Sequence, residues 1–195
     1  RLKKEFPQFI YISTDHTEKA GLATEYVDEH FYSDPIFFAA NTKMYDSLDR
    51  NGVSVYCGEY AATIGCKEGN LYAALGEAAF LTGIERNQDK VTMTSYAPLL
   101  SKNGHSNWSP DMMYFDNHHV DKTPSYWTQW LFGNYSGDTY LSTAVELQTP
   151  NSSLQNRLTA SVVRDSKTGK QYLKIANVSP VEVSFSLSGI TPSSA

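Results

Sequence analysis

Three side chains in the first third of the sequence belong to types that carry out acid, base and nucleophilic chemistry. Glu59 stands where the apolar and aromatic run of residues 53–57 stops. His30 and Tyr32 lie two residues apart in another apolar run, and residues two apart on a strand share one face. Hydrogen-bond donors favour the ionised form of a carboxylate, which can then act as a nucleophile. We therefore interpret Glu59 as a candidate catalytic carboxylate, with His30 and Tyr32 to orient it.

Each of these residues also has an ordinary structural explanation. A single carboxylate at a strand end is more often ion-paired or solvated than catalytic. An isolated histidine such as His30 is more often a satisfied core residue than a functional one. The elements around these residues decide between the two interpretations.

Strand and helix patterns alternate over the first two thirds of the chain. We expect strands over residues 9–12, 26–32, 53–62 and 90–96, and helices over residues 1–6, 42–50, 71–85 and 124–132. Asn41, Asn70 and Thr123 are predicted N-caps of the last three helices, and Ser33-Asp34-Pro35 is expected to stop the second strand. Strand, helix, strand units at this spacing imply parallel strands with right-handed crossovers.

The last third of the chain has a different pattern. Alternating strands are predicted over residues 140–147, 157–164, 171–177 and 181–187, with a hairpin turn over residues 165–169. The fold class is therefore α/β followed by all-β. We expect residues 1–136 to be the last four strands or so of a (β/α)₈ TIM barrel, and residues 137–195 to begin an incomplete C-terminal β-sandwich.

Composition excludes several classes of protein. The 195 residues carry a net charge of −5, which is unfavourable for binding nucleic acid, and no apolar run is long enough to span a membrane. Cys57 and Cys66 are too few for a disulfide framework, and Cys57 is expected to be a small buried hydrophobe. The sequence begins at Arg1 without Met, so the absence of a signal peptide does not locate the protein.

Five motifs occur in a fixed order along the chain. They are Asp-Glu-His-Phe-Tyr at 28–32, Gly-Glu-Tyr-Ala at 58–61, Leu-Gly-Glu-Ala-Ala-Phe with Thr-Gly-Ile-Glu-Arg-Asn at 75–87, Tyr-Ala-Pro-Leu at 96–99, and Trp-Ser-Pro-Asp-Met-Met-Tyr-Phe at 108–115. Together they resemble the α-L-arabinofuranosidases of glycoside hydrolase family 51, from residue 6 to about residue 189. The resemblance implies a barrel followed by a β-sandwich. It also implies a retaining hydrolase that removes terminal arabinofuranosyl groups from arabinoxylan or arabinan.

The resemblance also assigns roles to residues. Glu59 is similar to the family's nucleophile, at the end of a seventh barrel strand, and His30 and Tyr32 are similar to residues at the end of the sixth strand. The family's general acid/base lies in an Asn-Glu pair that is not found in this chain. Glu29 alternates with His30 and should face the opposite side of its strand. We therefore expect the acid/base to lie upstream and residues 1–195 to be inactive alone.

Other candidates have weaker support. Asn103 and Trp108 could supply a sugar hydrogen bond and an apolar platform, or could simply pack their loop. Glu77 and Glu85 are expected to make structural contacts, with Arg86 as a possible partner. His118 and His119 beside Asp116 invite a metal interpretation, but adjacent side chains diverge and a third ligand is missing at a recognisable spacing. We expect no metal and no cofactor.

Two alternatives remain open at this point. One is a non-catalytic carbohydrate-binding or degenerate barrel module, and the other is a related barrel glycosidase with a different sugar preference. The expected partner is an arabinose-containing polysaccharide or oligosaccharide, with neither nucleic acid nor membrane involved. The oligomeric state is open. An extracellular or periplasmic location is favoured over a cytoplasmic one.

Overall fold

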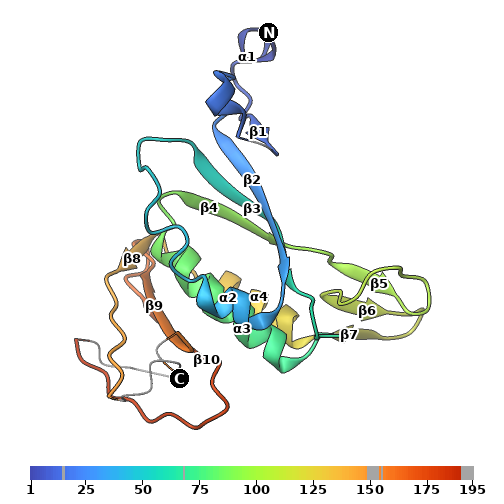
Figure 1. Ribbon diagram of the computed structural model, residues 1–195, viewed down its shortest axis with the longest axis vertical. Coiled ribbons are helices and arrows are strands. Elements are labelled where there is room, and N and C mark those ends of the chain that lie inside the picture. Colours follow the sequence, from blue (N-terminus) through green and yellow to red (C-terminus); the bar gives the residue numbers. More distant parts are fainter. Residues whose placement is uncertain (15, 68, 149–153, 155, 190–195) are drawn as a thin grey trace.

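The computed structural model describes residues 1–14, 16–67, 69–148, 154 and 156–189. The end of the predicted second domain, residues 190–195, lies outside the described residues. The N-terminal segment with helix α1 (Leu2–Glu5) stands away from the rest of the molecule, as Figure 1 shows. It is followed by the short 3-10 helix η1 (Thr17–Ala20).

A four-stranded parallel sheet forms the first part of the fold. Its strands are β1 (Ile12–Ser13), β2 (Tyr26–Ser33), β3 (Ser54–Ala62) and β4 (Val91–Tyr96), paired in the order β1-β2-β3-β4. The predictions for the last three strands are confirmed to within a residue or so. The first strand is shorter than residues 9–12 and lies later, because only Ile12 and Ser13 pair with β2. Parallel pairing confirms the α/β class of this part.

Three helices lie together on one side of this sheet, α2 (Pro35–Ala40), α3 (Leu71–Arg86) and α4 (Pro124–Asn134) (Figure 1). The predicted caps of the two longer helices are confirmed, since Asn70 accepts a bond from Ala73 N at 2.9 Å and Thr123 accepts one from Tyr126 N at 3.3 Å. These side chains satisfy amide groups that the first turn of a helix leaves free.

The prediction of a helix over residues 42–50 is wrong. The helix lies earlier, because Asp34 Oδ1 accepts a bond from Phe37 N at 2.9 Å and Pro35 occupies the first helical position. Asp followed by Pro is a helix-start signal as well as a strand stop. Asn41, predicted as an N-cap, instead ends helix α2, and its N–H bonds to Phe37 O.

A second, small sheet lies between the predicted strand over residues 90–96 and the predicted helix over residues 124–132, where neither a strand nor a helix is expected from the sequence. Its strands are β5 (Leu100–Lys102), β6 (Met113–Phe115) and β7 (Val120–Lys122), in the order β5-β6-β7. Each strand has only three residues, too few for a recognisable alternation of apolar and polar residues. The small sheet projects beyond the carboxyl end of β4 (Figure 1).

The last part of the described chain is antiparallel, as predicted. Strands β8 (Thr139–Leu141), β9 (Leu158–Arg164) and β10 (Gln171–Asn177) pair in the order β10-β9-β8. The predicted hairpin turn is present: Asp165 accepts a bond from Lys167 N at 2.9 Å, and Gly169 has φ 72°. The predicted strand over 140–147 shrinks to β8, and residues 181–187 form no strand. Val181 and Phe185 are largely exposed there, without the cross-strand neighbours that stabilise a strand.

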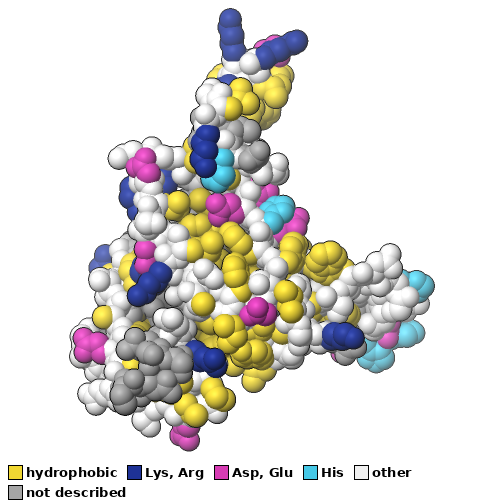
Figure 2. All heavy atoms as spheres, in the orientation of Figure 1, with side chains coloured by type: hydrophobic (Ala, Val, Ile, Leu, Met, Phe, Trp, Pro, Cys, Tyr) yellow, Lys and Arg dark blue, Asp and Glu magenta, His cyan; other side chains and the backbone are white. Residues whose placement is uncertain are grey.

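Helix α3 is the centre of the core. One face packs against the parallel sheet through Phe80 and Leu81, and another packs against β10 through Ala79. A methyl group at Gly83 would lie 2.1 Å from Thr42 O, so only glycine allows this close approach. Figure 2 shows hydrophobic side chains gathered in the middle of one face, with acidic and histidine side chains beside them where β2 runs.

Cys57 is fully buried, as expected for a small hydrophobe, and both cysteines are free thiols. None of the helices in the described part of the chain combines the length and the apolar character needed to cross a bilayer.

Candidate functional site

A β-bulge in β3 sets the direction of Glu59. Between the paired positions Asp28↔Tyr56 and His30↔Glu59, strand β2 advances two residues while β3 advances three. On the other side, β3 also advances three residues, from Cys57 to Tyr60, while β4 advances two. Strict alternation would have placed Glu59 on the helix side with buried Cys57. The bulge turns Glu59 to the other face, opposite His30.

Tyr32 and His30 both approach one oxygen of Glu59. The Tyr32 hydroxyl donates to Glu59 Oε2 at 2.6 Å, and His30 Nδ1 lies 3.6 Å from the same oxygen. Burial, together with the bond to Glu59, raises the pKa of Tyr32, so the hydroxyl keeps its proton and donates. The Glu59 side chain remains 43% exposed. The structure therefore brings the three residues together at an open surface.

Asp28 is a member of this group that the sequence analysis missed. Its Oδ2 lies 3.0 Å from His30 Nε2, and its side chain is only 14% exposed. The alternation of β2 could have revealed it, because Asp28, His30 and Tyr32 occupy alternate positions of one strand. The Glu29 side chain points to the opposite face of β2, as predicted, and accepts a hydrogen bond from the Tyr45 hydroxyl at 2.8 Å.

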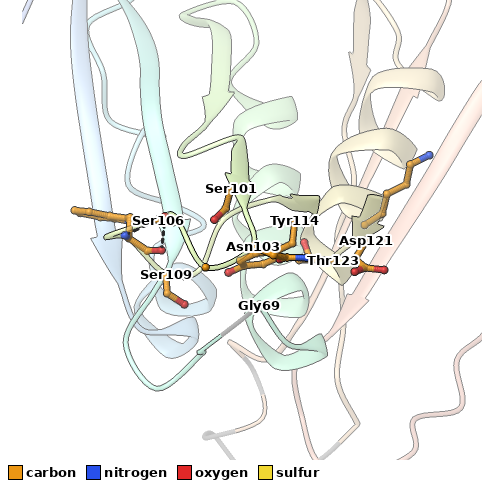
Figure 3. Close-up of a pocket in the computed structure, with 11 residues that line it drawn as sticks. Gly69, Ser101, Asn103, Ser106, Ser109, Tyr114, Asp121 and Thr123 are labelled. Carbon is orange, nitrogen blue, oxygen red and sulfur yellow. Dashed lines mark hydrogen bonds between the residues drawn. The ribbon is translucent and has the colours of Figure 1, made fainter. Parts of the chain in front are cut away.

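Trp108 lies beside this group, whereas Asn103 does not contact it. The rings of Trp108 and Tyr32 meet edge to face, with centroids 5.3 Å apart. Trp108 and Asn103 both line a neighbouring cavity of about 580 Å³ between the loop after β5 and strand β7 (Figure 3). In the described residues, no hydrogen bond joins the Asn103 side chain to Glu59; its backbone N–H bonds to Phe115 O at 2.8 Å.

The cavity is lined mainly by uncharged polar groups. Figure 3 shows Ser101, Asn103 and Tyr114 grouped together, with Asp121 and Thr123 from the end of the small sheet. Such a lining suits a ligand rich in hydroxyl groups.

Glu77 and Glu85 make structural contacts on helix α3. Glu77 is fully buried and accepts a bond from Ala62 N at 2.9 Å, at the end of β3. Burial raises the pKa of Glu77 to about 7. Glu85 binds the Ser161 hydroxyl and Lys174 on the antiparallel sheet. Among the ion pairs of the described residues, neither glutamate pairs with Arg86, the possible partner.

Arg86 instead pairs with Asp46 at 2.9 Å, on the segment that follows α2. Adjacent residues of a helix point in different directions, which explains why Arg86 and Glu85 contact different residues.

His118 and His119 belong to a turn that Asp116 organises. The carboxylate Oδ1 accepts backbone N–H bonds from His118 at 2.7 Å and from His119 at 2.8 Å. Across the described ranges of the chain, no three His, Cys, Asp or Glu side chains are grouped so as to hold a metal ion.

Comparison with known proteins gives consistent matches. A sequence model of the α-L-arabinofuranosidase C-terminal domain matches residues 53–195. The chain is 37% identical over 189 residues to α-L-arabinofuranosidase 2 of Arabidopsis thaliana, an alignment that covers 95% of this chain and 27% of that protein. It is 38% identical over 150 residues to the extracellular exo-α-L-arabinofuranosidase of Streptomyces chartreusis, covering 70% of this chain and 18% of that protein.

Solved structures give the same result. An arabinose-bound α-L-arabinofuranosidase of glycoside hydrolase family 51 superposes with a TM-score of 0.79 at 34% identity, over 91% of this chain and 30% of that one. The α-L-arabinofuranosidase of Thermotoga maritima, at 17% identity and a TM-score of 0.67, shares the fold over 90% of this chain and 44% of its own. The chain spans about a quarter of the length of the curated relatives it matches.

Proposed function

The chain belongs to the α-L-arabinofuranosidases of glycoside hydrolase family 51, whose C-terminal domain it matches, and we propose that it forms the C-terminal part of a retaining enzyme. That enzyme hydrolyses terminal non-reducing arabinofuranosyl groups of arabinoxylan or arabinan. Residues 1–136 are the last strands of its (β/α)₈ barrel, and residues 137–195 begin its β-sandwich. The parallel order β1-β2-β3-β4 with helices on one side supports the barrel assignment.

One observation carries the catalytic proposal. The Tyr32 hydroxyl donates to Oε2 of Glu59 at 2.6 Å, and His30 Nδ1 lies beside the same oxygen at 3.6 Å, beyond hydrogen-bond distance. Oε1 is the oxygen that remains for attack, and Glu59 lies in the carboxyl-terminal half of a parallel strand, toward the end at which barrel enzymes hold their reacting groups. In the first step Oε1 bonds to the anomeric carbon, the glycosidic bond breaks, and a general acid protonates the departing oxygen.

The second step regenerates the carboxylate. The same acid, now a base, takes a proton from water, and the water oxygen replaces Oε1 on the anomeric carbon. A retaining pair needs two carboxyl groups about 5–5.5 Å apart. Asp28 is the other carboxylate of this group, but its side chain is largely buried and its Oδ2 contacts His30. We assign the acid/base to a residue upstream of this chain, so residues 1–195 alone are inactive.

The neighbouring cavity supplies the contacts to sugar in this proposal. Trp108 offers an apolar surface against Tyr32, and Asn103 offers an amide on the wall of the cavity (Figure 3). Aromatic faces and amides are the usual partners of sugar rings and hydroxyls. An extracellular or periplasmic location agrees with a polysaccharide substrate and with the name of the Streptomyces relative.

The test is hydrolysis of an aryl α-L-arabinofuranoside by the full-length protein that carries this chain. Glu59→Gly should abolish turnover, and azide should restore release of the aryl group, because the small anion takes the place of the missing carboxylate. If the variant keeps its activity, or the wild type hydrolyses no furanoside, the catalytic proposal fails. The alternative of a non-catalytic carbohydrate-binding module then takes its place.

A further inference from the structure

Asp28 is a carboxylate that no hydrolytic step uses, and its surroundings are unusual. Its Oδ2 contacts His30 Nε2 at 3.0 Å. Its Oδ1 is buried and has no hydrogen-bond partner among the described residues. Burying an unpaired carboxylate oxygen is costly, so such a group in a native structure calls for a functional explanation.

The neighbouring strand is shaped to accept this carboxylate. A methyl group at Gly58 would lie 2.0 Å from Asp28 Oδ1 and 2.9 Å from Asp28 Cγ. Any side chain at residue 58 would therefore displace the carboxylate from its position. Gly58 also lies within the bulge that turns Glu59 toward His30. The same few residues of β3 thus place Glu59 and make room for Asp28.

The contact also determines where the His30 ring carries hydrogen. A carboxylate accepts hydrogen bonds and cannot donate one, so the hydrogen between Asp28 and His30 lies on Nε2. In the neutral ring Nδ1 is then an acceptor. The 3.6 Å between Nδ1 and Glu59 Oε2 is too long for a hydrogen bond. Two acceptors therefore face the same space, and a hydroxyl group of the substrate can donate to Nδ1 there.

We propose that Asp28 is a positioning residue, which fixes the orientation and tautomer of His30 so that Nδ1 accepts a hydrogen bond from a sugar hydroxyl beside Glu59. This inference rests on the proposed function, because it requires a sugar at Glu59. Carboxylate partners of functional histidines act in this way elsewhere, by holding the ring and selecting its tautomer.

The kinetic test is a double-mutant cycle in the full-length protein. Asp28→Asn should lower kcat/KM on the aryl arabinofuranoside by about 10–10²-fold, the range found for residues that orient metal-binding histidines. It should have almost no further effect in the His30→Ala background, since residues that act through one another are not additive. Glu29→Gln is the matched control, because Glu29 is the next residue on β2 and faces Tyr45. Its kcat/KM should equal that of the wild type.

The second test is spectroscopic and does not depend on turnover. Nitrogen chemical shifts of ¹⁵N-histidine-labelled protein, with His30 assigned through His30→Ala, should show the Nε2–H tautomer in the wild type. Asp28→Asn should change that signal, because its amide can also donate to Nε2. An equal loss of activity for Asp28→Asn with and without His30, or an Nδ1–H tautomer in the wild type, would overturn the inference.

The two proposals fail in different ways. If the wild type hydrolyses no furanoside or Glu59→Gly stays active, the proposed function fails, while the tautomer of His30 can still be measured. If Glu59→Gly is inactive and rescued by azide but Asp28→Asn behaves as the wild type, only the role of Asp28 fails.

Discussion

Two glutamates lie on opposite faces of the parallel sheet at strand β3, and they differ in burial and in hydrogen-bond partners. Glu59 lies on the side away from the helices, is 43% exposed, and meets Tyr32 and His30 through one oxygen. Glu77 comes from helix α3, is fully buried, and binds the backbone of Ala62 at the end of the strand.

The difference shows how the fold assigns different roles to one residue type. Burial disfavours the charged form of a carboxyl group and raises the pKa of Glu77 to about 7, which suits a neutral link between helix and strand. Glu59 keeps access to solvent and has a hydroxyl donor aimed at it, which suits a group that must react. The four predictions below, ordered by size of effect, test this contrast.

The largest effect is expected for Glu59→Gly in the full-length protein. Turnover of an aryl α-L-arabinofuranoside should fall by several orders of magnitude, because the variant lacks the group that bonds to the sugar in the proposed mechanism. The thermal midpoint should change little, since the side chain is half exposed. Turnover near the wild-type rate would show that Glu59 has only a structural role, as Glu77 has.

The next effect concerns stability and comes from Glu77. Its pKa in the folded protein is about 7, above the ordinary value of 4.5 that a glutamate has in an unfolded chain. The folded state therefore holds the proton more tightly, and stability is lost as pH rises from about 4.5 through 7. The shift corresponds to about 3 kcal/mol.

The measurement is the thermal midpoint of wild type and Glu77→Gln at pH 5 and pH 8.5. The glutamine stays neutral and keeps an oxygen for Ala62 N, so its midpoint should fall less between the two pH values than that of the wild type. Parallel changes in both proteins would mean that Glu77 does not titrate in this window.

Tyr32→Phe should have a smaller effect on catalysis. It removes the 2.6 Å bond to Glu59 but leaves the Glu59 carboxylate in place, so turnover should fall on the order of 10²-fold. The ring contact with Trp108 needs no hydroxyl and should persist. Steady-state kinetics with a melting curve as control measures this, and an unchanged rate would show that Glu59 does not need this donor.

The smallest effect is expected for Asp116→Ala, at a third carboxylate. Asp116 is also accessible and follows strand β6, but its hydrogen bonds go to the backbone of its own turn. Backbone donors at His118 and His119 lower the pKa of Asp116. Turnover should stay within about twofold of the wild type, because surface substitutions away from a site have small effects. A large loss would extend the functional region to this turn.

Much of the fold could be predicted because its signals are local. Asn70 and Thr123 were identified as caps from residue type and position, and both make the expected bonds. The alternation on β2 predicted that Glu29 would face away from His30, and it bonds to Tyr45 on the helix side. The α/β order of the first part and the antiparallel order of the last follow from the same periodicities.

The secondary-structure predictions that are wrong also have physical causes. Ser33-Asp34-Pro35 ends strand β2 and also starts helix α2, and a strand stop alone does not predict the helix that follows it. The strands β5, β6 and β7 are too short to show a period, and they exist because they pair with one another. Residues 181–187 carry a strand-like pattern, but no neighbouring strand pairs with them in the described part of the chain.

The sequence by itself determined which residues could form a site: a carboxylate in one strand, and a histidine and a tyrosine at alternate positions of another. Tertiary structure decided how they meet. The bulge that turns Glu59 toward His30 arises from pairing with β2 and β4 at once, and the space for Asp28 exists because Gly58 passes directly beneath it. Caps and alternation depend on neighbours in the chain and can be predicted from it. Register and close approach depend on segments that become neighbours only after folding.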